Sequence, residues 1–245
     1  MFCPSCSHKI AVNNQNYCDS CGYSFNVQQK PVSIISNVHR AQKMQLDIEI
    51  GITIDRTASS IPFQIGIPLT LETILRQISL KTNNIKCWLQ SHGDLDFNEY
   101  PILHSDGSLP EQAIEDVKKI VYAGGGDPQE NHLDALENLI NIVPWSSDSI
   151  KARGAIIAFM TDETKRPTKS GLTAKDISKI IKERNLLLYL VCQPKPYLCE
   201  LINFCGGMML EITNSPDPIT LQMIAGQLSS SIVFSVQNGS SVPIL

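Results

Sequence analysis

The sequence predicts an α/β protein with a doubly wound, mostly parallel sheet flanked by helices, preceded by a small metal-binding module. Residues 154–160 and 186–191 are short, wholly apolar runs, typical of central parallel strands that are buried on both faces. Segments with apolar residues at helical spacing alternate with these and other strand segments. Two closely spaced cysteine pairs come before this pattern. The alternation favours one α/β domain behind a separate N-terminal module.

Length and composition fit one domain with a sizeable core and a small appendage. The chain has 245 residues, of which 42% are apolar and 18% are charged. The net charge is -4; residues 1–45 hold four basic residues against one aspartate and so carry +3, which leaves -7 on the rest. No apolar run is long enough to predict a transmembrane helix, and the N-terminus has no apolar signal segment. We therefore expect a cytoplasmic protein without a membrane partner and with reduced cysteines.

The cysteine pairs have the spacing of a structural zinc site. Each C-x-x-C pair can aim two thiolates at one point, and four thiolates complete a tetrahedral Zn²⁺ site. Few large apolar residues surround the pairs, so metal binding would supply the folding energy of this segment. Redox dithiols or disulfides are the alternatives, and a reducing compartment favours zinc. The predicted zinc ligands are Cys3, Cys6, Cys18 and Cys21.

This segment resembles the short zinc ribbons at the ends of many bacterial proteins, with their CPxCG…CxxCG pattern. Ser7 replaces the first glycine of the pattern, and Gly22 provides the second. Such ribbons bind proteins or nucleic acid, or act as caps. Because aromatic and basic residues are few here, we favour a protein contact. The predicted organisation is a zinc ribbon (1–26), a linker (27–45), the α/β domain (46–236) and a flexible tail (237–245).

The first strand of the α/β domain ends in a group of oxygen-bearing side chains. Isoleucine occupies every second position of residues 48–54, and Asp55, Thr57 and Ser59 follow directly. A carboxylate and two hydroxyl groups then share one loop at the carboxyl end of a strand, where open α/β sheets place their sites. We expect these three side chains to act together.

The remaining elements follow from apolar spacing and from caps. Asp127 and Pro128 are expected to begin a helix, since proline suits the first helical position. Residues 92–99 form an acidic loop without EF-hand spacing, which we expect to be solvated. Residues 232–236 offer a further short strand. The expected order is 71–80 (helix), 85–90 (strand), 100–104 (edge strand), 110–122 (helix), 127–143 (helix), 154–160 (strand), 173–184 (helix), 186–191 (strand), 197–204 (helix), 208–212 (strand) and 218–231 (helix).

Two further loops carry similar groups at the same edge of the sheet. One is the run of three glycines that ends in Asp127, and the other is Thr161-Asp162 after a central strand. Hard oxygen ligands of this kind suit Mg²⁺, Mn²⁺ or Ca²⁺ rather than Zn²⁺. With few direct carboxylates, such an ion stays underneutralised and accepts a carboxylate from outside.

In this order, the motifs DxTxS, GGGDPQE and TDE resemble a von Willebrand factor A-type (vWA) domain with its metal-ion-dependent adhesion site. The resemblance covers roughly residues 47–231. It implies ligands Asp55, Thr57 and Ser59 from the first loop and Asp162 from the third. Many members have a threonine in the middle loop, where this chain has a glycine at position 126. Asp127 or a water molecule would fill that place.

The site favours binding over catalysis, because no nucleophile–base pair accompanies it. His132 is expected to be a plain surface residue of a helix, and the alternative is that it covers the metal loop. We predict a non-enzymatic adaptor or scaffold that holds the Asp or Glu of a protein partner through the ion, with the ribbon as a second contact. The remaining cysteines are expected to be core or near-surface thiols: Cys87, Cys192, Cys199 and Cys205.

The resemblance also implies a setting. Bacterial proteins of this kind often serve multi-protein stress-response or defence systems that contain a kinase, a phosphatase, an AAA+ ATPase or a nuclease. One alternative is a nucleic-acid adaptor that acts through the ribbon, with steeply salt-dependent binding. The other is a metal-dependent phosphoester hydrolase, in which Asp55, Asp127 and Asp162 hold two ions.

Overall fold

The structure, a computed structural model, describes most of the predicted α/β domain and most of the predicted C-terminal tail. The predicted zinc ligands Cys3, Cys6, Cys18 and Cys21 and the predicted linker lie outside the described residues, so the zinc ribbon stays a prediction. The described residues are 47–82, 84–148, 152–165, 167–213 and 217–244.

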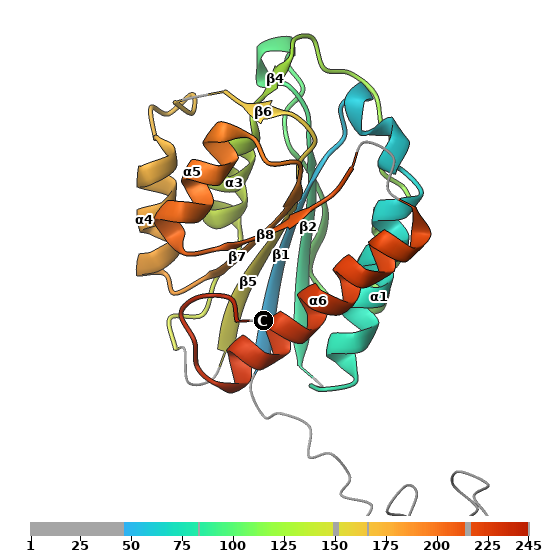
Figure 1. Cartoon of the computed structure of the whole chain (residues 1–245), viewed down its shortest axis with the longest axis vertical. Helices are drawn as coiled ribbons and strands as arrows, with labels where there is room; N and C mark the ends of the chain where they lie inside the picture. The colour runs from blue at the N-terminus through green and yellow to red at the C-terminus, as the bar shows by residue number, and fades with distance from the viewer. Residues whose placement is uncertain (1–46, 83, 149–151, 166, 214–216, 245) are drawn as a thin grey trace, which may run out of the picture. The chain divides into compact units, whose positions relative to one another are not determined.

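A central sheet runs through the described residues (Figure 1). Its strands are β1 (Asp47–Asp55), β2 (Ile85–His92), β3 (Ile102–Ser108), β5 (Ala152–Phe159), β7 (Leu187–Cys192) and β8 (Met208–Glu211). They lie in the order β3-β2-β1-β5-β7-β8, and all neighbours are parallel except β2 and β3. A short parallel pair is formed by β4 (Gln129–Glu130) and β6 (Glu163–Thr164). The predicted mostly parallel α/β sheet is confirmed.

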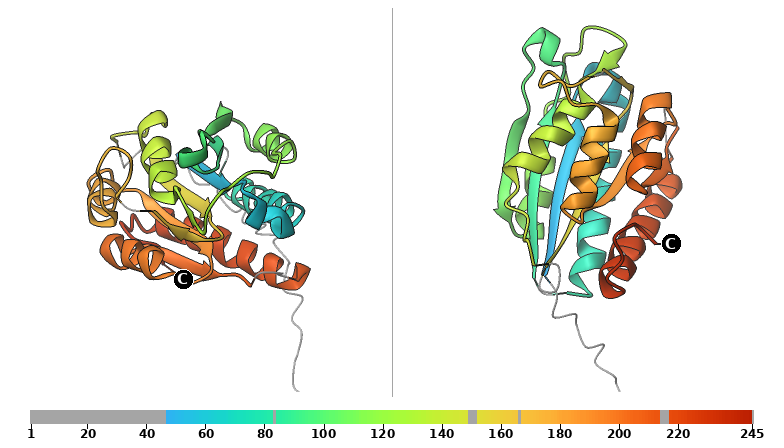
Figure 2. Two further views of the ribbon diagram at one scale, coloured as in Figure 1. Left: turned by 90° about the horizontal axis from the view of Figure 1, so that it is seen from above. Right: turned by 90° about the vertical axis from the view of Figure 1, so that its left-hand side faces the viewer.

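Helices cover both faces of the sheet (Figure 2). One layer consists of α1 (Gly66–Ser79), α2 (Pro110–Val117) and α6 (Pro218–Gln237). The other consists of α3 (His132–Ile142), α4 (Ala174–Glu183) and α5 (Pro196–Cys205). Two 3₁₀ helices, η1 (Ala58–Phe63) and η2 (Leu95–Phe97), lie in the loops after β1 and β2.

Strand β1 has one apolar face and one polar face. Its isoleucines, such as Ile50 and Ile52, are fully buried in the cluster that contains α1 and α6. The alternate positions, among them Gly51, Thr53 and Asp55, point toward the layer of α3. Because strand residues alternate between faces, β1 supplies the core on one side and a row of polar groups on the other.

Glycines in the two central strands leave room for the ring of Trp145. A Cβ at Gly51 would lie 2.8 Å from Cη2 of Trp145. A Cβ at Gly154 would lie 2.7 Å from Cε3 of the same ring and still closer to a methyl carbon of Leu186. Carbon atoms pack best at about 3.5–4.0 Å, so neither position accepts a side chain unless the ring moves.

We expect Gly154→Ala to lower the free energy of unfolding by about 1–3 kcal/mol, because the added methyl group overpacks the site. The same substitution at Gly226, inside α6 with no atom within 4 Å of the new Cβ, should stabilise by about 0.5–1 kcal/mol. Urea unfolding of the two variants measures both signs. Equal effects at the two positions would contradict the tight fit around Trp145.

The start of α3 corrects one prediction. The helix expected from Asp127 begins at His132, because residues 129–130 pair with β6 and Asn131 precedes the helix as its N-cap. The backbone carbonyl of Glu130 also accepts a hydrogen bond from the NH of Lys165 (2.8 Å). Pairing with a distant strand therefore overrides the local helix signal of Asp-Pro.

Two further elements differ from expectation. The edge strand expected at residues 100–104 spans Ile102–Ser108, since its register with β2 extends to the pair Cys87–Ser108. The strand offered at residues 232–236 is instead the last part of α6, which buries Ile232 and Val236 in the core.

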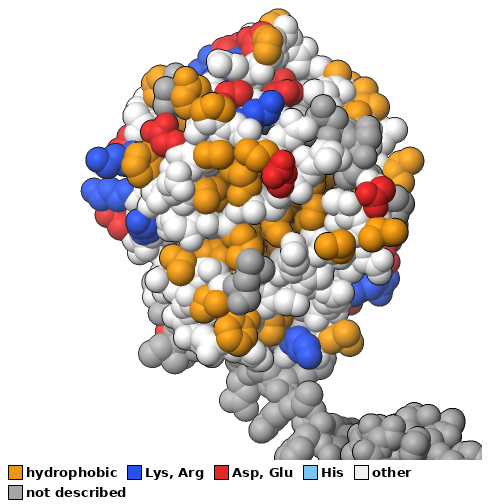
Figure 3. Space-filling view, viewed as in Figure 1, with side chains coloured by type: hydrophobic (Ala, Val, Ile, Leu, Met, Phe, Trp, Pro, Cys, Tyr) orange, Lys and Arg blue, Asp and Glu red, His pale blue; other side chains and the backbone are white. Residues whose placement is uncertain are grey.

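Helix α6 is long and apolar. By length and composition alone Ile219–Gln237 could cross a membrane, and 50% of that window is buried within the described structure. Its buried side chains, for example Ile224 and Leu228, belong to the cluster that includes α1. Hydrophobic side chains also gather on the surface over β8 and α6 (Figure 3). Met223 of α6 is one of the exposed apolar side chains. Core packing accounts for much of the apolar composition of this helix.

Candidate metal site

The three loops singled out in the sequence meet above the carboxyl end of β1. The backbone NH of Ala58 donates to the carbonyl of Gly124 (3.1 Å), and the NH of Ala123 donates to the carbonyl of Arg56 (2.8 Å). The loop after β5 joins them through the hydroxyl group of Thr161, which contacts Asp55. The structure thus brings the first loop, the glycine loop and the third loop together.

Asp55 lies at the centre of a cluster of hydroxyl groups. Its Oδ1 accepts hydrogen bonds from the backbone NH (2.9 Å) and the hydroxyl group (2.7 Å) of Thr57, and its Oδ2 accepts one from Thr161 (2.5 Å). The Ser59 hydroxyl oxygen lies 3.0 Å from that of Thr57 and 3.1 Å from that of Thr161. The predicted ligands of the first loop therefore adjoin one another. Thr161, which was named in the third loop but not among the predicted ligands, belongs to the same cluster.

The environment keeps Asp55 charged. Burial alone would raise the pKa of this carboxyl group, which is 1% exposed. At acid pH, where the rings of His132 and His92 begin to gain positive charge, these rings and the hydroxyl groups of Thr161 and Thr57 outweigh that effect, so the pKa of Asp55 lies below its usual range. A buried carboxylate of this kind requires compensating positive charge or hydrogen bonds.

A second buried carboxyl group, Glu130, lies beside this cluster. Its Oε1 would be 3.1 Å from a Cβ at Gly125, and its Oε2 has no hydrogen-bond partner among the described residues. Burial, followed by the charges of Asp55, Asp94 and Asp162, raises the pKa of Glu130 to about 8. The site therefore contains an acidic side chain that was not among the predicted ligands.

In the absence of divalent ions, the raised pKa of Glu130 should make the stability fall as the pH rises. Between the ordinary pKa of glutamate and about 8, the folded protein keeps a proton that the unfolded chain has lost. The contribution of Glu130 to the free energy of unfolding is complete below that range and is lost as the pH rises toward 8. The free energy of unfolding should fall by at most about 1.4 kcal/mol per pH unit. Urea unfolding in EDTA across this range measures the slope. Glu130→Gln should flatten it, and an unchanged slope in that variant would contradict the assignment.

Asp127, a predicted ligand, takes part in an ion-pair network around Lys165. The Nζ atom of Lys165 lies 2.8 Å from Asp94, 2.7 Å from Asp96 and 3.1 Å from Asp127. The acidic loop after β2 is thus not simply solvated, because the Asp94 side chain has no exposed surface. These contacts direct Asp127 toward Lys165, and Glu130 is the middle-loop carboxyl group that lies beside Asp55.

The middle loop requires glycine. Gly124 and Gly125 have φ angles of 95° and 78°, in the region that favours glycine. The NH of Gly125 donates to both carboxylate oxygens of Glu99 (3.1 and 3.0 Å). A side chain at Gly126 would collide with the ring of Phe97. This contact gives a physical reason for the absence of a hydroxyl-bearing residue at that position.

His132 is buried, and the expectation of a surface residue is wrong. It begins α3 and faces the sheet, with no exposed surface, and its Nδ1 lies 2.9 Å from Nε2 of the equally buried His92. The two rings meet edge to face, with centroids 5.2 Å apart. Burial lowers the pKa of both rings, and that of His92 falls to about 3. Both histidines are therefore neutral at ordinary pH.

Oxygen donors at this place fit a hard divalent cation. In the described parts of the chain no three His, Cys, Asp or Glu side chains are placed to hold an ion by themselves. Hydroxyl groups and water would have to complete the coordination sphere, and Mg²⁺ commonly keeps several waters in protein sites. The oxygen donors come from Asp55, Thr57, Ser59, Thr161, Glu130 and Asp162.

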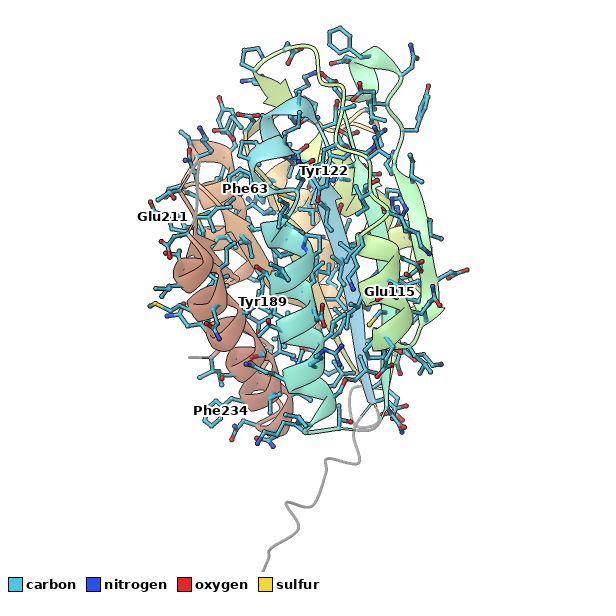
Figure 4. All side chains as sticks on the ribbon, turned by 90° about the vertical axis from the view of Figure 1, so that its right-hand side faces the viewer. Phe63, Glu115, Tyr122, Tyr189, Glu211 and Phe234 are labelled. Atoms are coloured by element: carbon cyan, nitrogen blue, oxygen red, sulfur yellow. The ribbon has the colours of Figure 1, made fainter. Side chains whose placement is uncertain are left out.

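Unpartnered polar atoms gather around the same place. Of the five buried side-chain nitrogen and oxygen atoms without a partner in the described residues, four belong to Arg56, Tyr122, Glu130 and His132. Figure 4 shows Tyr122 near the end of the sheet where the loops meet, and burial and then the charge of Asp55 raise the pKa of Tyr122. Since buried polar groups normally have partners, this concentration indicates a site that accommodates an additional group.

Comparison with solved structures classifies the fold. The crystal structure of the SpRpn10 VWA domain matches with a TM-score of 0.58 at 16% sequence identity, over 74% of this chain and 95% of that chain. The fold is of the vWA type. No family model matches the sequence, and no curated protein matches it. At this identity the vWA likeness concerns the fold alone, so any function rests on this chain's own residues.

Within this vWA fold, the site residues that the prediction missed differ in how visible they are in the sequence. Thr161 stands next to Asp162 at a strand end, and Glu130 closes the glycine-loop motif, so both had a local signal. His92 and Lys165 had none, because their roles depend on neighbours that are distant in the sequence.

Proposed function

We propose that the vWA-type domain is a non-enzymatic protein-interaction module that binds the Asp or Glu of a partner through a divalent ion. Mg²⁺ is the expected ion, with Mn²⁺ or Ca²⁺ as substitutes. Asp55, Thr57, Ser59 and Asp162 would hold it. Glu130 would be the ligand from the middle loop, the role that the prediction gave to Asp127.

The concentration of acidic and unpartnered polar groups at one accessible edge carries this proposal. Asp55 and Glu130 are buried, and Ser59, in the same cluster, is exposed. A cation would compensate the charge of Asp55 and give Glu130 a partner. An ion held from the protein side keeps a coordination position toward the solvent, where a carboxylate from outside can bind.

The expected setting of the module is cytoplasmic. We propose a multi-protein bacterial stress-response or defence system, with a kinase, phosphatase, AAA+ ATPase or nuclease as the partner. The predicted zinc ribbon with Cys3, Cys6, Cys18 and Cys21 would provide a second protein contact.

Partner capture by the full-length chain tests the proposal. Immobilised protein in Mg²⁺ should retain its partner, and EDTA should release it. Ser59→Ala should weaken capture, because it removes an exposed hydroxyl ligand with little effect on the core. Ser147→Ala, at an exposed serine in the loop before β5, is the matched control. Capture that is unaffected by both EDTA and Ser59→Ala would contradict an ion-mediated contact.

A further inference from the structure

A buried chain of hydrogen bonds leads from α3 through the sheet to the candidate site. Asn138 Nδ2 donates to Gln90 Oε1 (2.7 Å), and Gln90 Nε2 lies 3.1 Å from Thr53 Oγ1. Thr53 Oγ1 lies 2.9 Å from His92 Nδ1, and His92 Nε2 lies 2.9 Å from His132 Nδ1. Except for the partly buried Asn138, every side chain in this series of hydrogen bonds is at most 1% exposed.

One backbone carbonyl determines which groups donate and which accept along this series of hydrogen bonds. The carbonyl oxygen of Ala135 lies 2.7 Å from the Gln90 amide, and a carbonyl can only accept, so the amide nitrogen faces it. The second hydrogen of that nitrogen then goes to Thr53 Oγ1. Among the described residues, the other contact of this hydroxyl group is His92 Nδ1. If His92 Nδ1 accepts, the buried hydroxyl hydrogen has a partner, whereas the reverse direction would leave that hydrogen unpaired, so the accepting Nδ1 is favoured.

The donor–acceptor direction continues through the rings of His92 and His132. A neutral His92 that accepts at Nδ1 carries its hydrogen on Nε2 and donates to Nδ1 of His132. The 2.9 Å contact between two ring nitrogens independently requires a lone pair on one of them. His132 then carries its hydrogen on Nε2, at the end of the chain.

This terminal donor lies at the candidate site. Nε2 of His132 is buried and has no partner of normal hydrogen-bond geometry among the described residues. Burial lowers the pKa of His132, and the charges of Asp55 and Asp162 and the backbone of Asp162 oppose that effect in part, which places these groups close to the ring. A buried donor without a partner costs about 1–3 kcal/mol, so its retention calls for an acceptor in the functional state.

We infer that His132 is a positioning residue of the ion site: its Nε2–H holds the backbone carbonyl of Asp162 and thereby places the third loop for the ion. The hydrogen-bond chain keeps this donor in one tautomer. The inference rests on the proposed ion binding at Asp55 and Asp162. Groups that orient metal ligands in this way typically change metal affinity about 10–100-fold when they are removed.

Mn²⁺ titration of the full-length protein, by calorimetry and by electron paramagnetic resonance, tests the role of His132. His132→Asn keeps a group near the Nδ1 position but loses the Nε2 donor, and should weaken Mn²⁺ binding about 10-fold or more. His132→Gln places an amide nitrogen near Nε2 and should restore much of the affinity. His104→Asn, at a histidine that contacts Ser91 instead, is the matched control and should bind like the wild type.

Ring-nitrogen NMR supplies a readout that does not depend on the metal. The wild type should show His92 and His132 in the Nε2–H tautomer, and Thr53→Val should mix the tautomers because it removes the hydroxyl donor. Unchanged Mn²⁺ affinity in His132→Asn, or Nδ1–H tautomers in the wild type, would overturn the inference. If the wild type itself bound no Mn²⁺, the proposed function would fail with it. If Asp55→Ala lost the ion while His132→Asn kept it, only the role of His132 would fail.

Discussion

Asp55→Asn should weaken the binding of Mg²⁺ or Mn²⁺ by roughly 100-fold or more. The substitution keeps the size of the side chain but removes the buried negative charge at the centre of the hydroxyl cluster. Two unit charges about 4 Å apart interact by about 4 kcal/mol at an effective dielectric constant of about 20, and a divalent ion doubles this energy. Each tenfold change in affinity corresponds to about 1.4 kcal/mol, so a loss of about 100-fold is a lower bound. Calorimetric titration of the full-length protein with each ion measures the loss.

Asp106→Asn is the matched control for that measurement. Asp106 lies in β3, is exposed, and accepts a hydrogen bond from the indole of Trp88 (3.0 Å), away from the three loops. It should bind the ion like the wild type. If Asp55→Asn also bound normally, the ion would have to lie elsewhere.

Lys165→Met should destabilise the folded domain by about 3 kcal/mol. The ammonium group of Lys165, whose side chain is 15% exposed, pairs with three carboxylates, of which Asp94 is fully buried. Without the lysine the buried carboxylate keeps its desolvation cost and loses its main partner. Chemical unfolding at neutral pH, with ions removed by EDTA, measures the effect on the domain alone.

Lys169→Met is the matched control for that experiment, because it removes a lysine of the same network that is exposed rather than buried. Lys169 also pairs with Asp96, but its side chain is 55% exposed, so its contribution should stay below about 1 kcal/mol. Equal losses in the two variants would show that the buried position of Asp94 does not matter. The difference between them should persist at high salt, because buried pairs are screened less than exposed ones.

The sequence was sufficient for the fold because its signals are local. The alternating isoleucines of β1, the apolar runs of β5 and β7, and the capping threonine of α4 each depend on neighbouring residues. Thr173 forms the capping box of α4 with Asp176. Positions decided by long-range pairing were predicted less well, as the start of α3 shows: β6 draws residues 129–130 into a strand.

The residues of the candidate site also fall into two groups, those predicted from local spacing and those found only in the folded structure. Asp55, Thr57 and Ser59 lie within five residues and were found from their spacing. The pairing of His92 with His132 joins residues 40 positions apart, and no spacing rule indicates it. Glu130 stood in the quoted motif, but its burial beside Asp55 is visible only once the chain is folded.

The contact between Phe97 and Gly126 makes these two positions dependent on each other. A threonine at position 126 would supply the missing hydroxyl group only if the Phe97 ring moved aside. The effects of Gly126→Thr and Phe97→Ala on ion affinity should therefore not add. A smaller residue at position 97 would remove the need for that movement, so the loop should accept a hydroxyl-bearing side chain more readily in such a background.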